Sequence, residues 1–293
     1  MQKLRVLLGF PETNEEKPLG IKLFVYFTAL LLGIALGGML TALIGIANPN
    51  SMKAGQAISS VLMFVVPPLA LYFTTKPEPM RQIGCTRVPN GKLLLAGAAI
   101  MFVASPVINQ LTFWNEAMHL PAALSEVEKW LRTMEERAAE VTKQMLAADN
   151  IGGLLVNIFV MALIPAVGEE LTFRAVIQQH LVKACRNAHV GIILSAAIFS
   201  AVHFQFYGFL PRMLLGIFLG YFFYTTKSLW VSILMHFLNN ASAVVLHYLN
   251  NNGVISIDVG HPNDSVHPII LTISIVISIL LIVYAWRKRE KEA

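Results

Sequence analysis

Three short stretches place polar side chains with catalytic potential inside otherwise apolar sequence in the C-terminal half of the chain. They read EELTFR from residue 169, FSAVH from residue 199 and HFLNN from residue 236. Side chains four residues apart share one face of a helix. This spacing joins the following pairs: Glu170 with Arg174, Phe199 with His203, and His236 with Asn240. Because Glu169 points about 100° away from Glu170 on a helix, we predict that Glu170 pairs with Arg174 and that Glu169 stays free.

A carboxylate, two imidazoles and a carboxamide that meet in a pocket of low dielectric constant suit the hydrolysis of an amide bond. Glu169 could take a proton from water, and His203 could hold or polarise that water. His236 and Asn240 could donate hydrogen bonds to the oxyanion of the tetrahedral intermediate. Glu169, His203 and His236 could instead bind Zn²⁺, with water as the fourth ligand. The spacing alone leaves both chemistries open.

The elements that must position these residues are predicted to be membrane-spanning helices. The chain has 293 residues, of which 56% are hydrophobic and only 13% are charged, and its mean hydropathy is +0.62. Soluble domains carry about 25% charged residues, and a membrane span needs about 20 apolar residues. The sequence therefore predicts an all-α fold, a polytopic membrane helix bundle with about eight transmembrane helices. Their expected ranges are 21–46, 57–75, 93–114, 151–182, 189–204, 211–226, 229–249 and 268–286.

The basic residues predict the orientation of this bundle. With the N-terminus inside, 15 of the 22 lysines and arginines fall in inner loops or at the termini. Six, including Arg212, fall outside, and Arg174 is left within a span. This bias matches the positive-inside rule, so both termini are expected to be cytoplasmic in a multi-pass protein of a bacterial inner membrane. The net charge of +5 follows from this orientation, and no nucleic-acid partner is implied.

The candidate residues are expected at similar depths in the bilayer. At about 1.5 Å per residue, Glu169 and His203 lie about 21 Å above the inner ends of their spans. His236 lies about 12 Å and Asn240 about 18 Å above the inner end of a third span. Ionisable side chains within a span cost at least about 2.5–3.5 kcal/mol and are therefore functional candidates. The four side chains are predicted to meet in one layer within the membrane.

Residues 121–150 form the one stretch with the composition of a soluble segment. Apolar residues recur there at alternating spacings of three and four, which predicts an amphipathic helix over about 121–147. Ser125 and Glu128 resemble a capping box, and Glu128 can pair with Arg132. This helix could lie at the membrane surface or form a lid that gates substrate entry, and the sequence does not choose between the two.

Two regions follow from these expectations. Residues 1–150 are expected to hold three transmembrane helices and the amphipathic helix. Residues 151–293 are expected to hold the C-terminal helices, with the three motifs inside about 160–245.

Some glycines have the GxxxG spacing that lets helices approach closely. These are Gly33 with Gly37 and Gly216 with Gly220.

The three motifs, in this order, resemble those of the CAAX-protease and bacteriocin-processing family of intramembrane proteases, also called CPBP or Abi. EELTFR is similar to the EExxxR motif of that family, FSAVH to FxxxH and HFLNN to HxxxN. Residues 1–150 carry none of these motifs. The resemblance implies a bundle of eight helices and an intramembrane endopeptidase activity.

The resemblance also implies roles for individual residues. These are water activation for Glu169 and His203, oxyanion stabilisation for His236 and Asn240, and support for Glu170, Arg174 and Phe199. The family is described both as zinc metalloproteases and as metal-free, glutamate-dependent enzymes. We favour the metal-free description, with no cofactor; the zinc version would use Glu169, His203 and His236.

Two other kinds of function remain open on the sequence. A proton-coupled transporter could use Glu169 and the histidines as a proton relay, although the inverted repeats common in transporters are not visible. A catalytically inactive membrane scaffold or immunity protein could keep the fold alone. The expected partners are the lipid bilayer and a peptide or protein substrate within or near the membrane. The sequence does not specify that substrate.

Overall fold

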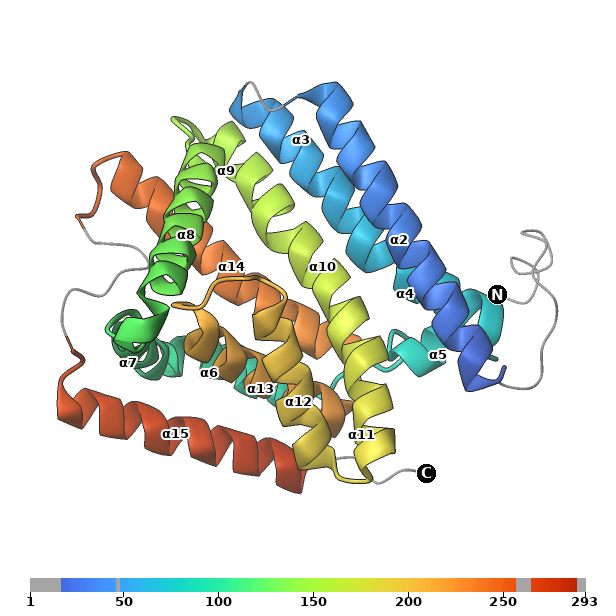
Figure 1. Cartoon of the computed structure of the whole chain (residues 1–293). Coiled ribbons are helices and arrows are strands. Elements are labelled where there is room, and N and C mark those ends of the chain that lie inside the picture. Colours follow the sequence, from blue (N-terminus) through green and yellow to red (C-terminus); the bar gives the residue numbers. More distant parts are fainter. Residues whose placement is uncertain (1–16, 46–47, 257–264, 289–293) are drawn as a thin grey trace.

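The chain folds as a bundle of helices, described here by a computed structural model that covers residues 17–45, 48–256 and 265–288 (Figure 1). Every regular element in these ranges is helical, with η marking 3₁₀ or π segments. In chain order the elements are α2 (Leu19–Ile44), α3 (Pro49–Ser60), η1 (Val61–Val65), α4 (Val66–Thr75), α5 (Pro79–Ile83), α6 (Gly91–Val103), α7 (Ser105–Glu116), η2 (Ala122–Leu124), α8 (Ser125–Leu146), α9 (Ile151–Asn157), η3 (Ile158–Leu163), α10 (Ile164–Glu170), η4 (Leu171–Gln178), α11 (Gln179–Cys185), α12 (Ala188–Ala201), α13 (Phe209–Thr226), α14 (Leu229–Asn251) and α15 (Pro268–Arg287). The predicted fold class, a polytopic helical bundle, is confirmed.

Six continuous helices among the described residues are long and apolar enough to cross a membrane. Consecutive α-helical and π-helical segments are counted here as one helix. They are Leu19–Ile44, Pro49–Thr75, Ile151–Cys185, Phe209–Thr226, Leu229–Asn251 and Pro268–Arg287. The α6 and α7 helices together make a seventh, bent by 42°. Pro106 lies in the first turn of α7. Because proline has no N–H and its ring clashes with the preceding turn, it explains the break.

The eighth expected span is shorter than predicted. The range 189–204 was expected to cross the bilayer, but α12 has 14 residues and ends at Ala201. Its rise is about 21 Å, against a hydrocarbon core of about 30 Å. The helix stops because the chain turns, with Phe204 in the left-handed region at φ 53. For the part of the chain that the structure describes, the expectation of eight full spans is therefore corrected to six, with the bent pair as a seventh and α12 as a short apolar helix.

The helix Ile151–Cys185, which carries the first motif, alternates between α-helical and π-helical segments. Ile158–Leu163 and Leu171–Gln178 are π-helical. Pro165 follows the first of them, where its missing N–H interrupts the regular hydrogen-bond ladder. The second begins directly after Glu170, inside the motif itself. Such turns are rare and often lie at functional sites.

Small residues let neighbouring helices pack closely, as the glycine spacing predicted. A Cβ atom added to Gly216 would lie 3.0 Å from the Cβ of Ala196, and one added to Gly220 would lie 2.8 Å from the Cγ2 of Ile192. The α13 and α12 helices therefore touch along their backbones. Gly33 and Gly37 of α2 do the same against η1 and α3.

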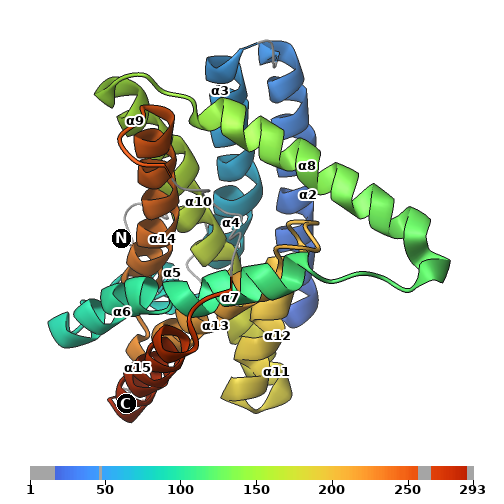
Figure 2. The same cartoon turned by 90° about the vertical axis from the view of Figure 1, so that its left-hand side faces the viewer.

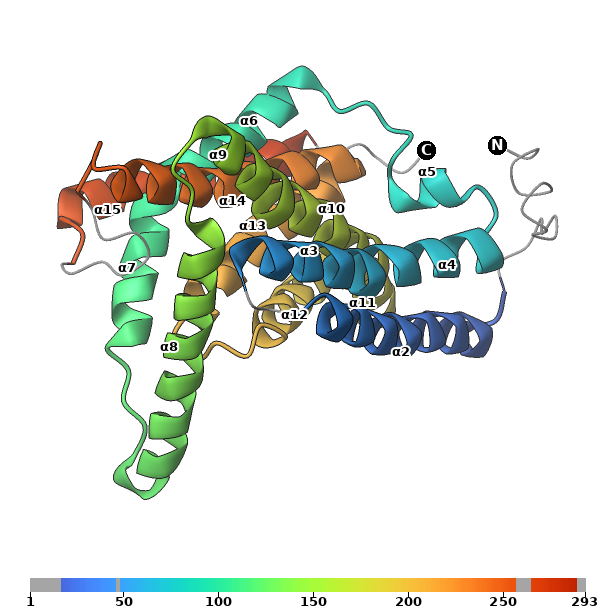
Figure 3. The same cartoon turned by 90° about the horizontal axis from the view of Figure 1, so that it is seen from above.

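The motif-bearing helices lie at the centre of the bundle. The α10 helix packs against α14 on one side and against η1 and α3 on the other, and Figures 1 and 3 show it between them. Two clusters of buried apolar side chains flank this centre, one mainly from α6, α13 and α14 and the other mainly from α2, α4, η4 and α14. The polar residues of the motifs are thus surrounded by apolar packing.

The α8 helix crosses the outside of the bundle (Figure 2), where it contacts α3, α9 and α14. The predicted amphipathic helix is therefore present. Its expected capping box is not, because Ser125 already lies inside the helix and no side chain caps its first turn. Apolar side chains of its stripe, such as Val127, Met134 and Val141, remain exposed.

Candidate functional site

An ion pair lies fully buried where α10 meets η4. The Nε atom of Arg174 is 2.9 Å from Oε2 of Glu170, and neither side chain is exposed. The expected pairing of these residues is therefore present, although the contact lacks the direction of a hydrogen bond. The guanidinium also lies 5.1 Å above the ring of Phe199. A charge at this depth needs its partner, because an unpaired buried charge costs far more than an exposed one.

His236 of α14 connects the two adjacent glutamates of the first motif. Its Nδ1 atom is 3.0 Å from Oε1 of Glu170, and its Nε2 atom is 3.8 Å from Oε2 of Glu169. A carboxylate paired with arginine is ionised and only accepts hydrogen bonds, so Nδ1 carries the proton. The imidazole is 3% exposed and the Glu169 side chain 15%. Glu169 is therefore the more accessible carboxylate, and it makes no hydrogen bond to the described residues.

The ring of Phe199 separates the two imidazoles of the site. It meets His203 edge-on at 5.2 Å and His236 edge-on at 5.8 Å between ring centroids. The Nδ1 atom of His203 is 2.8 Å from the carbonyl oxygen of Phe199. Because a carbonyl oxygen only accepts, Nδ1 donates and a neutral His203 presents Nε2 as an acceptor. Phe199, the first residue of the second motif, thus fixes the orientation of His203, the last.

Asn240 lies one helical turn beyond His236 on α14 and is half-buried. Its Oδ1 atom accepts a hydrogen bond of 3.1 Å from the side chain of Asn239. Within the described chain it forms no hydrogen bond with Glu169, His203 or His236. The side-chain amide nitrogen of Asn240 therefore remains available as a hydrogen-bond donor.

Arg212 is a charged neighbour of the site that the charge count placed on the outer side. It lies in the first turn of α13, where its charge acts on both Glu169 and His203. Its Nη2 atom donates a hydrogen bond of 2.6 Å to Oε1 of Gln205. It also interacts electrostatically with Glu135 of α8. An arginine directly after a proline in an apolar run was the signal that could have identified it.

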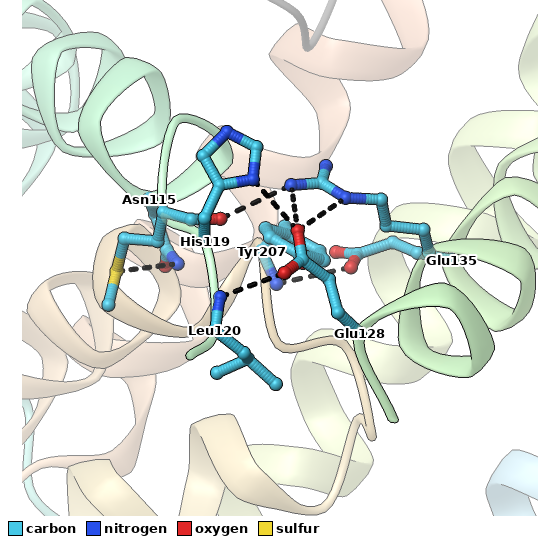
Figure 4. Close-up of polar contacts among 8 residues, drawn as sticks. Asn115, His119, Leu120, Glu128, Glu135 and Tyr207 are labelled. Carbon is cyan, nitrogen blue, oxygen red and sulfur yellow. Dashed lines mark hydrogen bonds and ion pairs between the residues drawn. The ribbon is translucent and has the colours of Figure 1, made fainter. Parts of the chain in front are cut away.

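The segment that follows His203 is held by hydrogen bonds to side chains of α7 and α8. Asn115 of α7 donates to the carbonyl oxygen of Phe206 at 3.0 Å and accepts from the amide of Leu210 at 2.8 Å. Glu135 accepts a hydrogen bond of 3.1 Å from the amide of Tyr207, as Figure 4 shows. The amphipathic helix α8 therefore contacts the segment beside the site, and loss of water around Glu135 raises the pKa of its carboxyl group.

A second carboxylate, Glu128, secures the corner between α7 and α8 (Figure 4). It accepts a hydrogen bond of 2.8 Å from the amide of Leu120 and bonds of 2.9 and 3.1 Å from Arg132. The predicted pair between Glu128 and Arg132 is therefore confirmed. His119 contacts it as well, at 2.9 Å. These donors, the Leu120 amide first among them, lower the pKa of Glu128 to about 2. The guanidinium of Arg132 also lies 4.1 Å from the ring centroid of Tyr207.

Metal coordination was the alternative chemistry for Glu169, His203 and His236. Among the residues that the structure describes, no three His, Cys, Asp or Glu side chains are grouped closely enough to hold an ion. In this conformation the described residues Glu169, His203 and His236 are therefore not grouped as a zinc site.

Comparison with known proteins gives one finding. Residues 151–242 match the sequence model of a family described as "Type II CAAX prenyl endopeptidase Rce1-like". The matched segment begins with α9 and ends within α14, so it contains all three motifs. No curated protein and no solved structure matches the chain.

Proposed function

Because residues 151–242 match the sequence model of the Rce1-like family of type II CAAX prenyl endopeptidases, we propose that the chain is an intramembrane endopeptidase. It hydrolyses a peptide bond of a membrane-associated peptide or protein. The single observation that carries this proposal is the position of His236 between the paired Glu170 and the more accessible Glu169, inside a bundle of membrane-spanning helices. A buried array of this kind suits acid–base chemistry on a bound peptide.

Glu169 acts as the general base. It is the carboxylate without an arginine partner at contact distance, so its oxygens are available to accept a proton from the attacking water. His203 holds that water through Nε2, since its Nδ1 is committed to the Phe199 carbonyl. General base catalysis of this type contributes about 100- to 10,000-fold to the rate.

His236 and Asn240 stabilise the oxyanion that forms on the substrate carbonyl. To donate from Nε2, His236 must carry protons on both nitrogens, because Nδ1 is bonded to Glu170. Asn240 donates from its amide nitrogen. One donor of an oxyanion site is worth about 100- to 1,000-fold in rate.

Glu170 and Arg174 position the base and the oxyanion donor. The bond from His236 to Glu170 fixes the imidazole, and Arg174 offsets the carboxylate charge that this bond requires. These residues act through His236 and do not touch the substrate. Phe199 has a similar role for His203.

The proposed reaction needs no metal ion. Zinc bound by Glu169, His203 and His236 would supply a Lewis acid and an activated water, and that version would make cleavage sensitive to chelators. Activity that persists after chelation supports the metal-free reaction.

A comparison of membrane proteomes tests the proposed function. Membranes that carry wild-type protein are expected to accumulate cleaved peptides that are absent with Glu169→Gln, and a chelator should leave the difference unchanged. Loss of the peptides on chelation would favour the zinc version. If no peptide differs, and the purified protein instead moves a solute in a manner that depends on Glu169, the protein is a transporter and the peptidase proposal is wrong.

A further inference from the structure

A basic cavity of about 650 Å³ opens among the ends of α5, α11 and α13, and neither Glu169 nor His236 lines it. Its lining contains four cationic side chains and one carboxylate, so the ionisable groups carry a net charge of +3. The cations are Arg81, Arg87, Lys183 and Lys227, and the carboxylate is Glu78. Such a concentration of positive charge in a bundle poor in charged residues indicates an anionic ligand.

The wall of this cavity is fixed by hydrogen bonds between distant parts of the chain. The segment 82–87 is tied to α11 and to the start of α14 by four of them. These are Gln179 to the Gln82 carbonyl at 3.0 Å, Leu229 to the Gly84 carbonyl at 3.1 Å, Trp230 to the Cys85 carbonyl at 2.9 Å and Ser228 to the Arg87 carbonyl at 3.0 Å. Gly84 adopts φ 89, and a Cβ there would meet the Lys227 carbonyl at 2.9 Å. The cavity is therefore a built feature of the fold.

Aromatic side chains place the cavity at the level of lipid headgroups. Tyr224, which lines it, stacks on Trp286 with ring centroids 5.6 Å apart, and Lys227 lies 4.1 Å from the Tyr224 centroid. Trp230, which is bonded to the Cys85 carbonyl, is about half exposed. Tryptophan and tyrosine gather at membrane–water interfaces, and this end carries the loops that the charge distribution predicts to be cytoplasmic.

We propose that this cavity is a binding site for a phosphate group, carried by an anionic phospholipid headgroup or by a soluble phosphate. Arginine and lysine are the side chains that bind phosphate most strongly, and basic pockets between transmembrane helices bind anionic headgroups. The phosphate would compete with Glu78 for Arg81, since these two now form an exposed ion pair of 3.0 Å. The site is independent of the proposed peptidase activity.

Lipid retention by the full-length protein tests this site. The protein is reconstituted in nanodiscs of equimolar phosphatidylcholine and phosphatidylglycerol, extracted gently, and analysed for bound lipid by native mass spectrometry. The wild type is expected to retain phosphatidylglycerol in preference to phosphatidylcholine. The Arg81→Gln/Lys183→Gln variant should retain about 10- to 30-fold less, because each basic residue near an anionic surface contributes about fivefold.

A matched variant controls for general surface charge. Lys92 and Arg287 are exposed cations expected on the same side of the membrane, and they do not line the cavity, so Lys92→Gln/Arg287→Gln should retain phosphatidylglycerol like the wild type. A second arm measures thermal stabilisation of each protein by inorganic phosphate in neutral detergent. Stabilisation that only the cavity variant loses, without lipid retention, assigns the site to soluble phosphate. If the cavity variant behaves like the wild type in both arms, the proposal is wrong.

Discussion

His236 and Glu170 are joined across α14 and α10 by a hydrogen bond of 3.0 Å between Nδ1 and Oε1. This bond commits one nitrogen of the imidazole to a fully buried carboxylate and leaves the other 3.8 Å from Glu169. The two adjacent glutamates therefore have different surroundings. Glu170 is fully buried and bonded to the imidazole, and Glu169, the proposed base, is the more accessible of the two.

Removing the Glu170 carboxylate should destabilise the protein strongly. In Glu170→Ala, Arg174 becomes an unpaired charge with no exposure, which costs about 3–5 kcal/mol in the free energy of unfolding. Denaturant unfolding in detergent measures this. The double variant Glu170→Ala/Arg174→Met should be less destabilised than Glu170→Ala alone. Equal losses in both would contradict a paired buried charge.

Removing the His203 imidazole should abolish most activity without unfolding the protein. In His203→Ala, one hydrogen bond to the Phe199 carbonyl is lost, which costs about 0.5–1.5 kcal/mol. The rate of cleavage should fall about 100- to 10,000-fold, because the attacking water loses the imidazole that holds it beside Glu169. The control is His180→Ala, since His180 makes the same kind of bond to a backbone carbonyl, that of Val176, away from the site. Equal activity of both variants would count against a role for His203 in hydrolysis.

The corner between α7 and α8 should loosen at low pH. Donors from Leu120, Arg132 and His119 lower the pKa of Glu128 from 4.5 to about 2. The stabilisation is therefore fully present above about pH 4.5 and is lost as the pH falls toward 2. Hydrogen exchange at the Leu120 amide should accelerate over that window.

Two variants separate this effect from general acid sensitivity. In Glu128→Gln the exchange at Leu120 should already be fast at neutral pH and depend little on pH in that window. Glu126→Gln, on the same helix but without a hydrogen bond in the described chain, should leave the wild-type profile intact. A wild-type profile in Glu128→Gln would rule out this carboxylate as the cause.

The segment after His203 should depend on Asn115. In Asn115→Leu, the Phe206 carbonyl and the Leu210 amide lose their partner, and each lost hydrogen bond costs about 0.5–1.5 kcal/mol. Hydrogen exchange at Leu210 should become faster. Asn109→Leu is the control, because Asn109 is an exposed residue of the same helix and its replacement should change nothing. Unchanged exchange in Asn115→Leu would mean that other contacts hold the segment.

Local spacing was sufficient to predict part of the site. The pair between Glu170 and Arg174 follows from a separation of four residues on one helix, and the same holds for Glu128 and Arg132 on α8. Helix periodicity is a property of the neighbouring sequence, so these contacts can be derived before the fold is known. The polytopic helical class followed from composition for a similar reason.

Contacts between distant segments could not be derived in this way. The bond between His236 and Glu170 joins residues 66 positions apart, and it depends on how α10 and α14 pack. The early end of α12 could not be predicted from the aromatic residues that follow it. Such residues suit both an interfacial helix and a loop, so they do not mark where the helix ends. Arg212 was placed outside because a charge count treats each arginine as solvated, whereas here Glu135 and Glu169 offset its charge.

The most direct test of the account is the rate at which purified protein cleaves a peptide identified from the membrane comparison. The account predicts that Glu169→Gln lowers this rate by about 100-fold or more. Its free energy of unfolding should stay close to that of the wild type, because Glu169 makes no hydrogen bond to the described residues. A Glu169→Gln protein that cleaves the peptide at the wild-type rate would contradict the assignment of Glu169 as the base.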